Sequence, residues 1–249
     1  LAVTALEGFE LPGDSGAGGP ARALAPGLGL ASLPLLRPGE PRDSLQMDVE
    51  RTTSRLIGQF ASVEEAGIVP GVVLLPRHDS LRPPLLWDRR RLEVGELREA
   101  SVVVTEGRPP AALLLSAVRI PALSGDSLPL PLSPAALSGW LRRDLAYEGV
   151  VAAAVEDVAA QTGMGGEEAA IALLANGVDL LVGVEDPAAV VDAIVDAVEA
   201  GVIDRRRLTE ATLRMLRLRA AAMAAAEKVG ADSAGAAPSV RALVAGSGA

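Results

Sequence analysis

The chain has 249 residues and a net charge of −9, from 23 lysine and arginine residues against 32 aspartate and glutamate residues. This length fits one large α/β barrel or two smaller domains, and the acidic balance argues against a nucleic-acid partner, because phosphate contacts need a basic surface. The absence of cysteine excludes disulfides, thiolate metal sites and cysteine nucleophiles. With one histidine and no cysteine, a zinc site would have to be built almost entirely from carboxylates, so no metal is expected.

Residues 1–7 contain neither a basic stretch nor a cleavage site, so they do not form a signal peptide. A cytoplasmic location is therefore the default expectation. These residues lack an initiator methionine and begin inside an apolar run, so we expect the natural N-terminus to lie upstream of Leu1, or the gene product to be truncated. No apolar run reaches the length of a membrane span, and no membrane partner is expected.

Apolar runs alternate with helical segments along the chain, which predicts βα units and a parallel sheet. Six runs are almost continuously apolar, as expected for strands covered on both faces. They span residues 1–6, 29–33, 71–75, 111–116, 149–155 and 178–182. Helices are predicted at residues 47–66, 93–106, 134–146, 166–176, 187–200 and 205–229. Loops are predicted at the Gly- and Pro-rich segments 13–26, 37–41 and 82–86.

Six strands are fewer than the eight of a complete (β/α)8 barrel. We therefore predict an α/β fold, a TIM (β/α)8-type barrel that is incomplete at its N-terminus. Residues 1–229 are assigned to this barrel domain, and residues 230–249, which are rich in Ala, Gly and Ser, to a flexible tail.

Several short motifs predict helix ends. Asn176-Gly177 has the composition of a left-handed helix stop. Asp186-Pro187 and Ser133-Pro134 place a capping side chain before a proline at the first helical turn. The glycine-rich segment 163–166 fits neither a P-loop nor a dinucleotide fingerprint, so it is interpreted as a flexible loop. The arginine runs 89–91 and 205–207 are interpreted as solvated faces.

Four segments in the second half of the chain carry a family resemblance. They are Leu-Ser-Pro-Ala-Ala-Leu-Ser-Gly-Trp-Leu-Arg at residues 132–142, Gly-Val-Val-Ala-Ala-Ala at 149–154, Ala-Leu-Leu-Ala-Asn-Gly-Val-Asp-Leu-Leu at 172–181 and Arg-Leu-Thr-Glu-Ala-Thr-Leu-Arg-Met-Leu-Arg-Leu-Arg at 207–219. Together they resemble the barrel of glycoside hydrolase family 3, in particular its bacterial β-N-acetylhexosaminidases. The resemblance implies a carbohydrate (amino-sugar) ligand, no cofactor, and a scaffold role for Asp179.

The polar positions that the family uses at its strand ends hold other residues here, mostly small or apolar ones. The family's nucleophilic aspartate falls on Ala154, and its acid/base histidine falls near Leu81. Further family polar positions fall on Ala5, Arg37, Val73, Leu74 and Ala117. The apolar scaffold positions are retained, which indicates selection for folding without selection for catalysis.

We therefore predict a barrel that has lost hydrolytic activity. Its remaining role would be structural, packing against another domain or subunit, or weakly carbohydrate-binding. The alternative is a divergent, active β-N-acetylhexosaminidase that hydrolyses O-glycosyl bonds of amino sugars with Glu156 as nucleophile. A third possibility is an incomplete chain whose catalytic parts lie in a missing segment.

Glu156 and Asp157 are the candidate catalytic residues, because a retaining glycosidase needs a carboxylate nucleophile and a separate acid/base about 5 Å away. A two-residue insertion would align Glu156 with the nucleophile, and alternation along a strand would place it on the same face as Ala154. Against this, both carboxylates can simply cap the following loop or helix, and insertions inside strands disturb the hydrogen-bond ladder.

His78 and Trp87 are the candidate substrate-binding residues. His78, beside Asp79, has the side chain for an acid/base near neutral pH, or it is a loop histidine that shapes the pocket. Trp87 lies in a proline-rich loop and could stack on a sugar. Trp140, on a predicted helix beside Leu137 and Leu141, is expected to pack in the core.

Overall fold

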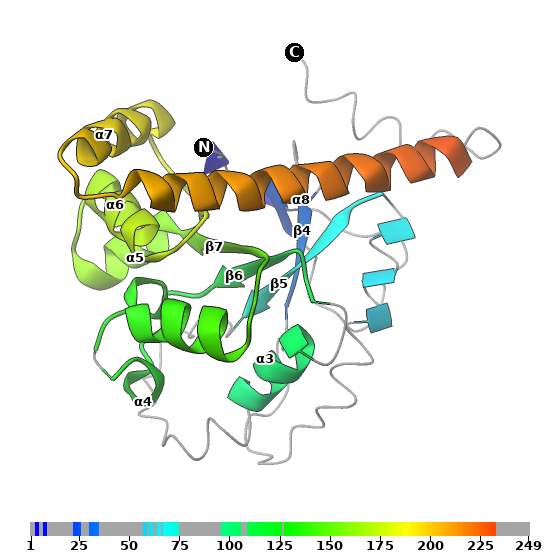
Figure 1. Cartoon of the computed structure of the whole chain (residues 1–249), viewed down its shortest axis with the longest axis horizontal. Coiled ribbons are helices and arrows are strands. Elements are labelled where there is room, and N and C mark those ends of the chain that lie inside the picture. Colours follow the sequence, from blue (N-terminus) through cyan, green and yellow to red (C-terminus); the bar gives the residue numbers. More distant parts are fainter. Residues whose placement is uncertain are drawn as a thin grey trace.

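The computed structural model describes residues 3–4, 7–8, 22–25, 30–34, 57–58, 60–61, 64–65, 67–74, 96–105, 109–125 and 127–232 (Figure 1). They form an α/β fold in which a largely parallel sheet is flanked by helices. The expected fold class is confirmed. The candidate residues His78 and Trp87 lie outside the described residues, and so do Ala5, Arg37 and Leu81.

Eight strands form one sheet in the described part of the chain. They are β1 (Val3–Thr4), β2 (Glu7–Gly8), β3 (Arg22–Ala25), β4 (Leu30–Pro34), β5 (Val69–Leu74), β6 (Ala112–Leu115), β7 (Val150–Ala154) and β8 (Leu180–Val182). The order is β1-β8-β7-β6-β5-β4-β3-β2. The pairs from β4 to β8, and β8 with β1, are parallel, whereas β3 is antiparallel to both β2 and β4. The sheet is thus an incomplete barrel in which the two ends of the order, β1 and β2, are neighbours in the chain.

Each of the six predicted strands overlaps an observed strand, but two short strands were not predicted. β3 lies inside the Gly- and Pro-rich segment 13–26, so the prediction of a loop across that whole segment was wrong. β3 is paired on both sides, with β2 and with β4, and this pairing outweighs the composition of the segment.

The helical elements follow the predicted order. They are α3 (Glu96–Thr105), α4 (Pro121–Ser124), η2 (Leu130–Leu132), η3 (Ala135–Asp144), α5 (Val155–Thr162), α6 (Gly166–Asn176), α7 (Pro187–Glu199) and α8 (Arg205–Asp232). Only scattered residues of the predicted helix 47–66 are described, and all of those are helical. η3 is a π-helix, closed by a bond from the Leu145 N–H to the Trp140 carbonyl.

The predicted helix ends are confirmed by hydrogen bonds. Asp186 Oδ1 accepts from the N–H groups of Ala188 and Ala189, at 3.0 and 3.1 Å. Gly177 ends α6 with φ = 115°, a conformation that favours glycine. Ser133 Oγ accepts from the Ala136 N–H at 3.3 Å.

The segment 163–166 was expected to be a flexible loop after a strand, and it is instead a tight link between two helices. Gly163 (φ = 78°) caps the C-terminus of α5, and Gly165 caps the N-terminus of α6. Glycine suits both cap positions because α5 ends and α6 begins within three residues.

The core lies on both faces of the sheet. On one face, a large cluster joins alternate strand residues, such as Val151 and Ala153, to helices α6, α7 and η3. On the other face, a second cluster joins Val150, Ala152 and Ala154 to Leu218 and Ala222 of α8. Trp140 is partly buried and packs against the first cluster, as expected. In a closed barrel the helices form the outer ring, and side chains of the strands fill the interior. Here the sheet face opposite α6 and α7, which carries Ala154, corresponds to that interior, and α8 packs against it.

Candidate functional site

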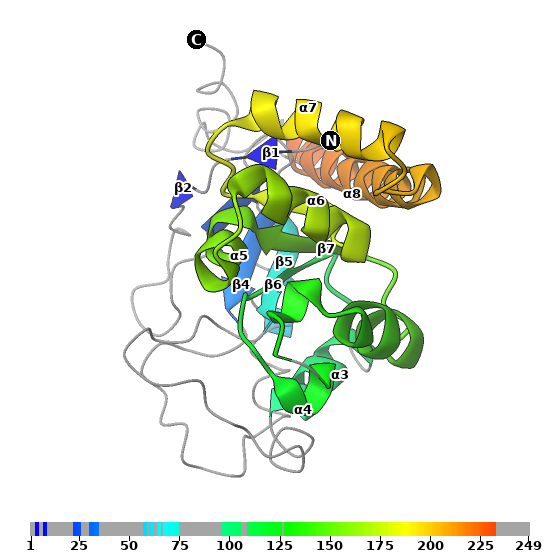
Figure 2. The same cartoon turned by 90° about the vertical axis from the view of Figure 1, so that its left-hand side faces the viewer.

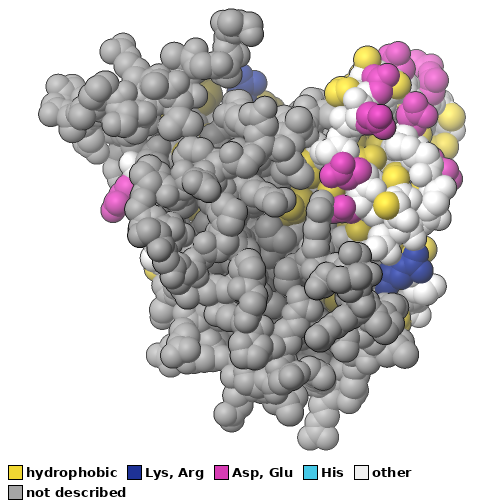
Figure 3. Space-filling view, turned by 180° about the vertical axis from the view of Figure 1, so that it is seen from behind, with side chains coloured by type: hydrophobic (Ala, Val, Ile, Leu, Met, Phe, Trp, Pro, Cys, Tyr) yellow, Lys and Arg dark blue, Asp and Glu magenta, His cyan; other side chains and the backbone are white. Residues whose placement is uncertain are grey.

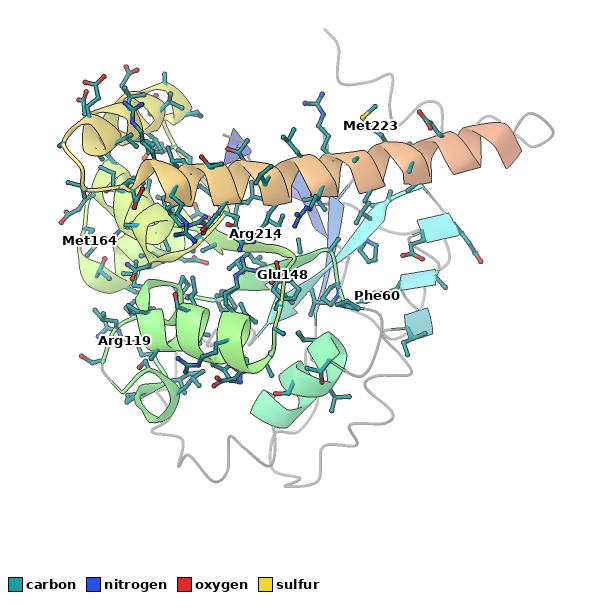
Figure 4. The ribbon with its side chains drawn as sticks, viewed as in Figure 1. Phe60, Arg119, Glu148, Met164, Arg214 and Met223 are labelled. Carbon is teal, nitrogen blue, oxygen red and sulfur yellow. The ribbon has the colours of Figure 1, made fainter. Side chains whose placement is uncertain are left out.

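The most extensive polar cluster described surrounds Asp179, which precedes β8. The carboxylate is buried and accepts hydrogen bonds at both oxygens. Its Oδ2 accepts from Arg142 Nη2 at 2.7 Å and from the Val151 N–H at 3.0 Å. Its Oδ1 accepts from Arg207 Nη2 at 2.6 Å and from Arg214 Nη1 at 3.2 Å. Arg214 projects from α8 toward the strands (Figure 4).

This cluster joins η3, the start of β8 and α8 at the edge where the strands begin. Conserved function in such barrels is built at the opposite edge, where strands end, and the starting edge contributes stability. The scaffold role that the resemblance implied for Asp179 therefore agrees with its contacts. Arg207 was expected to be solvated with its neighbours, and this was wrong, because its guanidinium is largely buried against Asp179 and the carbonyls of Leu174 and Val178.

Arg142 extends the cluster to Tyr147, a buried residue just before β7. Arg142 Nη1 donates to the carbonyls of Tyr147 and Gly149, at 2.6 and 2.8 Å, and its guanidinium carbon lies 5.4 Å from the Tyr147 ring centre. The Tyr147 hydroxyl donates a hydrogen bond to the Pro110 carbonyl oxygen, at 3.0 Å. Burial lowers the pKa of Arg142, although the attraction of Asp179 opposes this shift. Burial raises the pKa of Tyr147, and the nearby Arg142 charge partly offsets that shift.

The opposite edge of the sheet, where β7 ends, is apolar at the position of the expected nucleophile. Ala154 is the last residue of β7 and is 5% exposed. It belongs to the second core cluster, whose other buried members are Val69, Ala112, Val150, Ala152, Leu180, Val182, Leu218 and Ala222. Ala117, at another replaced family position, is half-buried and packs against the first cluster.

The candidate carboxylates Glu156 and Asp157 lie in the first turn of α5. The prediction that the strand continues to Val155, with Glu156 on the face of Ala154, was wrong, because β7 ends at Ala154 and the helix follows without a loop. Carboxylates in a first turn interact favourably with the helix dipole, which is the capping role considered as the alternative.

The Glu156 side chain nevertheless lies at the edge where the strands end. It is exposed, and a Cβ atom built on Gly183, which follows β8, would come within 3.1 Å of its Cδ and Oε1 atoms. The carboxyl group therefore lies over the end of β8.

Arg119 is a charged residue of this edge that sequence analysis did not single out. It follows β6, and its Nη2 donates to the Gln161 carbonyl in the last turn of α5, while its Nε is buried without a hydrogen-bond partner. The sequence offers one signal for this residue, because Arg119 is a charged residue directly after the apolar run that forms β6. The bond holds α5 against the end of β6.

Two kinds of structural feature are absent from the described part of the chain. None of its helices has both the length and the hydropathy needed to cross a bilayer. No group of three or more His, Asp or Glu residues within it has the spacing of a metal site.

Comparison with known proteins agrees with the architecture. The family model described as "Glycosyl hydrolase family 3 N terminal domain" matches residues 103–218, slightly less than half of the chain. The structure of a glycoside hydrolase family 3 β-N-acetylglucosaminidase from Paenibacillus sp. str. FPU-7 is similar over 78% of this chain, with 26% sequence identity and a TM-score of 0.62. No curated protein gives a significant match.

Two further solved structures share the fold at lower identity. The β-N-acetylglucosaminidase from Thermotoga maritima matches 70% of this chain, with 17% identity and a TM-score of 0.61. A glycosyl hydrolase family 3 member from Mycobacterium smegmatis str. MC2 155 matches 67% of the chain, with 22% identity and a TM-score of 0.57. This chain covers only 39%, 39% and 55% of the lengths of the three structures. The resemblance is confirmed, and residues 103–218 match the N-terminal domain of glycosyl hydrolase family 3.

Proposed function

We propose that this chain is a family 3-like barrel that does not hydrolyse glycosides and that keeps a structural or weak carbohydrate-binding role. The observation that carries the proposal is the environment of Ala154. A retaining glycosidase needs a carboxylate nucleophile, and this position instead holds an alanine that is 5% exposed and belongs to the second core cluster.

The ligand class in this proposal comes from the relatives. Two of the similar structures are described as β-N-acetylglucosaminidases. An N-acetylated amino sugar is therefore the ligand to test first, and Trp87 is the residue proposed to stack on it. Another domain or subunit is the proposed partner for the structural role.

Turnover is the direct test. The full chain should release no more chromophore from an aryl β-N-acetylglucosaminide than buffer alone, and Glu156→Gln should leave this background unchanged. Turnover by the full chain that disappears in Glu156→Gln would overturn the proposal.

The packing around Ala154 can be tested separately through stability. Ala154→Asp should lower the free energy of unfolding by about 3 kcal/mol or more, because a carboxylate would be buried among apolar side chains. Ala160→Asp, at an exposed position of α5, is the matched control and should cost about 1 kcal/mol or less. Equal stability of the two variants in urea unfolding would show a polar, solvated pocket at Ala154 and count against the proposal.

Weak sugar binding has its own measurement. The full chain should bind N-acetylglucosamine weakly and saturably when the titration is measured by calorimetry or by ligand-detected NMR. Trp87→Ala should reduce this binding. Trp140→Phe serves as the control, because Trp140 packs against the core. Saturable binding that Trp87→Ala leaves unchanged would remove Trp87 from the proposal.

A second candidate function is favoured by the position of the Glu156 carboxyl over Gly183, at the edge where catalytic groups lie in these barrels. In this alternative, Glu156 is the nucleophile of a divergent β-N-acetylhexosaminidase, Asp157 supports it, and His78 supplies the acid/base. A 2-fluoro sugar covalently attached to Glu156, mapped by peptide mass spectrometry, would establish it. An unmodified chain after prolonged incubation would exclude it.

A further inference from the structure

Helix α8 carries an apolar stripe on its solvent side. Its buried residues Ala211, Leu218 and Ala222 recur at helical spacing and face the sheet. At about 100° per residue, the positions diametrically opposite include Leu213, Leu216 and Ala220. Leu213 and Leu216 are 50% and 56% exposed, and Met223, at the margin of the stripe, is 57% exposed. A surface helix normally presents polar residues on this side.

Helix α7 carries a smaller exposed apolar stripe, and the charged residues beside it are acidic. Val191 and Val195 are 40% and 50% exposed, on the side away from the buried Val190 and Ile194. The same side exposes three carboxylates, Asp192, Asp196 and Glu199, and α7 contains no basic residue. Figure 3 shows acidic side chains interspersed with hydrophobic patches over the region of α5 to α7.

Two arginines flank the middle of the α8 stripe. Arg217 and Arg219 are exposed and lie on its two sides. Arg207 and Arg214, in contrast, point inward to Asp179 and are not part of this surface. The two helices are joined by residues 200–204, in which Val202 is 61% exposed, and α8 starts at the end of the molecule that carries α7 and runs from there to the opposite side (Figures 1 and 2).

We propose that two copies of this chain associate by packing the valine-and-carboxylate face of α7 from one copy onto the leucine-and-arginine face of α8 from the other. Both faces are present in every copy, so a two-fold arrangement of the copies makes the contact twice and closes the dimer, as an isologous interface requires. Valine and leucine side chains supply the apolar centre, and carboxylates facing guanidiniums supply the polar rim. An α8-to-α8 contact is disfavoured because it would bring like charges together.

Charge reversal tests the pairing, with the oligomeric state of the full chain measured by sedimentation over a concentration series. The unmodified chain should dimerise. The double variant Arg217→Glu/Arg219→Glu should weaken dimerisation by about tenfold or more, because acidic faces would then meet. Asp192→Arg/Asp196→Arg should have the same effect for the opposite reason. An equimolar mixture of the two variants should restore a dimer, since each contact again pairs opposite charges.

Two controls separate this interface from general effects. Leu216→Ser should weaken the dimer, whereas Leu128→Ser, which changes an exposed leucine outside both faces, should not. Arg143→Glu, on η3, controls for net charge. A monomeric unmodified chain would overturn the proposal, and so would a dimer that all charge reversals leave intact or two variants that fail to associate when mixed.

Discussion

At the scale of single residues, Asp179 is the side chain on which most polar contacts converge. It binds guanidinium groups from η3 and from two turns of α8, so three segments that are distant in the sequence meet at one carboxylate. Removing one partner of a buried ion pair leaves the others uncompensated, which costs more than the pair itself contributes.

Asp179→Ala should therefore lower the free energy of unfolding by about 3–5 kcal/mol in urea titrations followed by circular dichroism. Glu210→Ala, which removes only the exposed i,i+4 partner of Arg206, is the control and should cost well under about 1 kcal/mol. A similar small loss for both variants would show that the Asp179 cluster contributes little to stability.

Tyr147 gives a pH-dependent prediction that can be observed directly, because it is the only tyrosine in the chain. Burial raises its pKa above the ordinary value of 10.0. The folded state should therefore show no phenolate absorbance at a pH of about 10.5, whereas the urea-unfolded chain should show it. The stability that this group contributes is fully present below about pH 10 and is lost as the pH rises above that value. Phenolate appearing near pH 10 in the folded chain would contradict the buried position.

Sequence reasoning located some residues of the site and misplaced others for identifiable reasons. Ala154 was found from the motif around the strand, and the structure places it at the strand end. Arg207 was misread because a run of three arginines does not reveal the phase of its helix, and only one of the three turns inward. Glu156 was misplaced because Val155 is apolar and no Gly or Pro separates β7 from α5.

At the scale of elements, the link between η3 and β7 is tightly packed around Gly149. A Cβ atom on Gly149 would lie 2.3 Å from the Tyr147 hydroxyl oxygen and 2.9 Å from the Ala111 carbonyl oxygen. Both distances are shorter than real contacts allow. A residue with a side chain at position 149 would therefore fit only if Tyr147 moved.

Gly149→Ala should therefore destabilise the fold by about 3 kcal/mol or more, through overpacking and loss of the Tyr147 hydrogen bond. Gly165→Ala is the matched control, because a Cβ there meets nothing within 4 Å and its φ is −67°. We expect this control to change stability by about 1 kcal/mol or less in the same denaturant titrations. Equal effects of the two substitutions would contradict the packing described around Tyr147.

Elements with local end signals were predicted well, and elements that depend on tertiary partners were not. α6 and α7 have a glycine stop or an aspartate cap in the sequence, and their predicted starts are the observed ones. β3 has no apolar run of its own and depends on β2 and β4. The π-helical form of η3 depends on bonds five residues apart, which the apolar periodicity does not specify.

At the scale of the whole molecule, β7 is the centre of the described fold. All five of its residues are buried, it pairs with β6 and β8, and its two faces belong to different core clusters. The last turns of α8 are the opposite case, because residues 223–227 are exposed or only partly buried. The family match, at residues 103–218, includes β7 and the two strands that pair with it, β6 and β8.

Native-state hydrogen exchange should follow this contrast. Amides of β7 should exchange through openings close to the free energy of global unfolding, and amides of residues 223–227 through local fraying that costs little. The measurement should be made on dilute protein, because the proposed dimer would cover part of α8 and slow its exchange. If residues 223–227 were as protected as β7 at the lowest concentration, the end of α8 would be covered within a single chain. Met223, the one residue of the outward stripe that lies in this segment, would then not be available to a second copy.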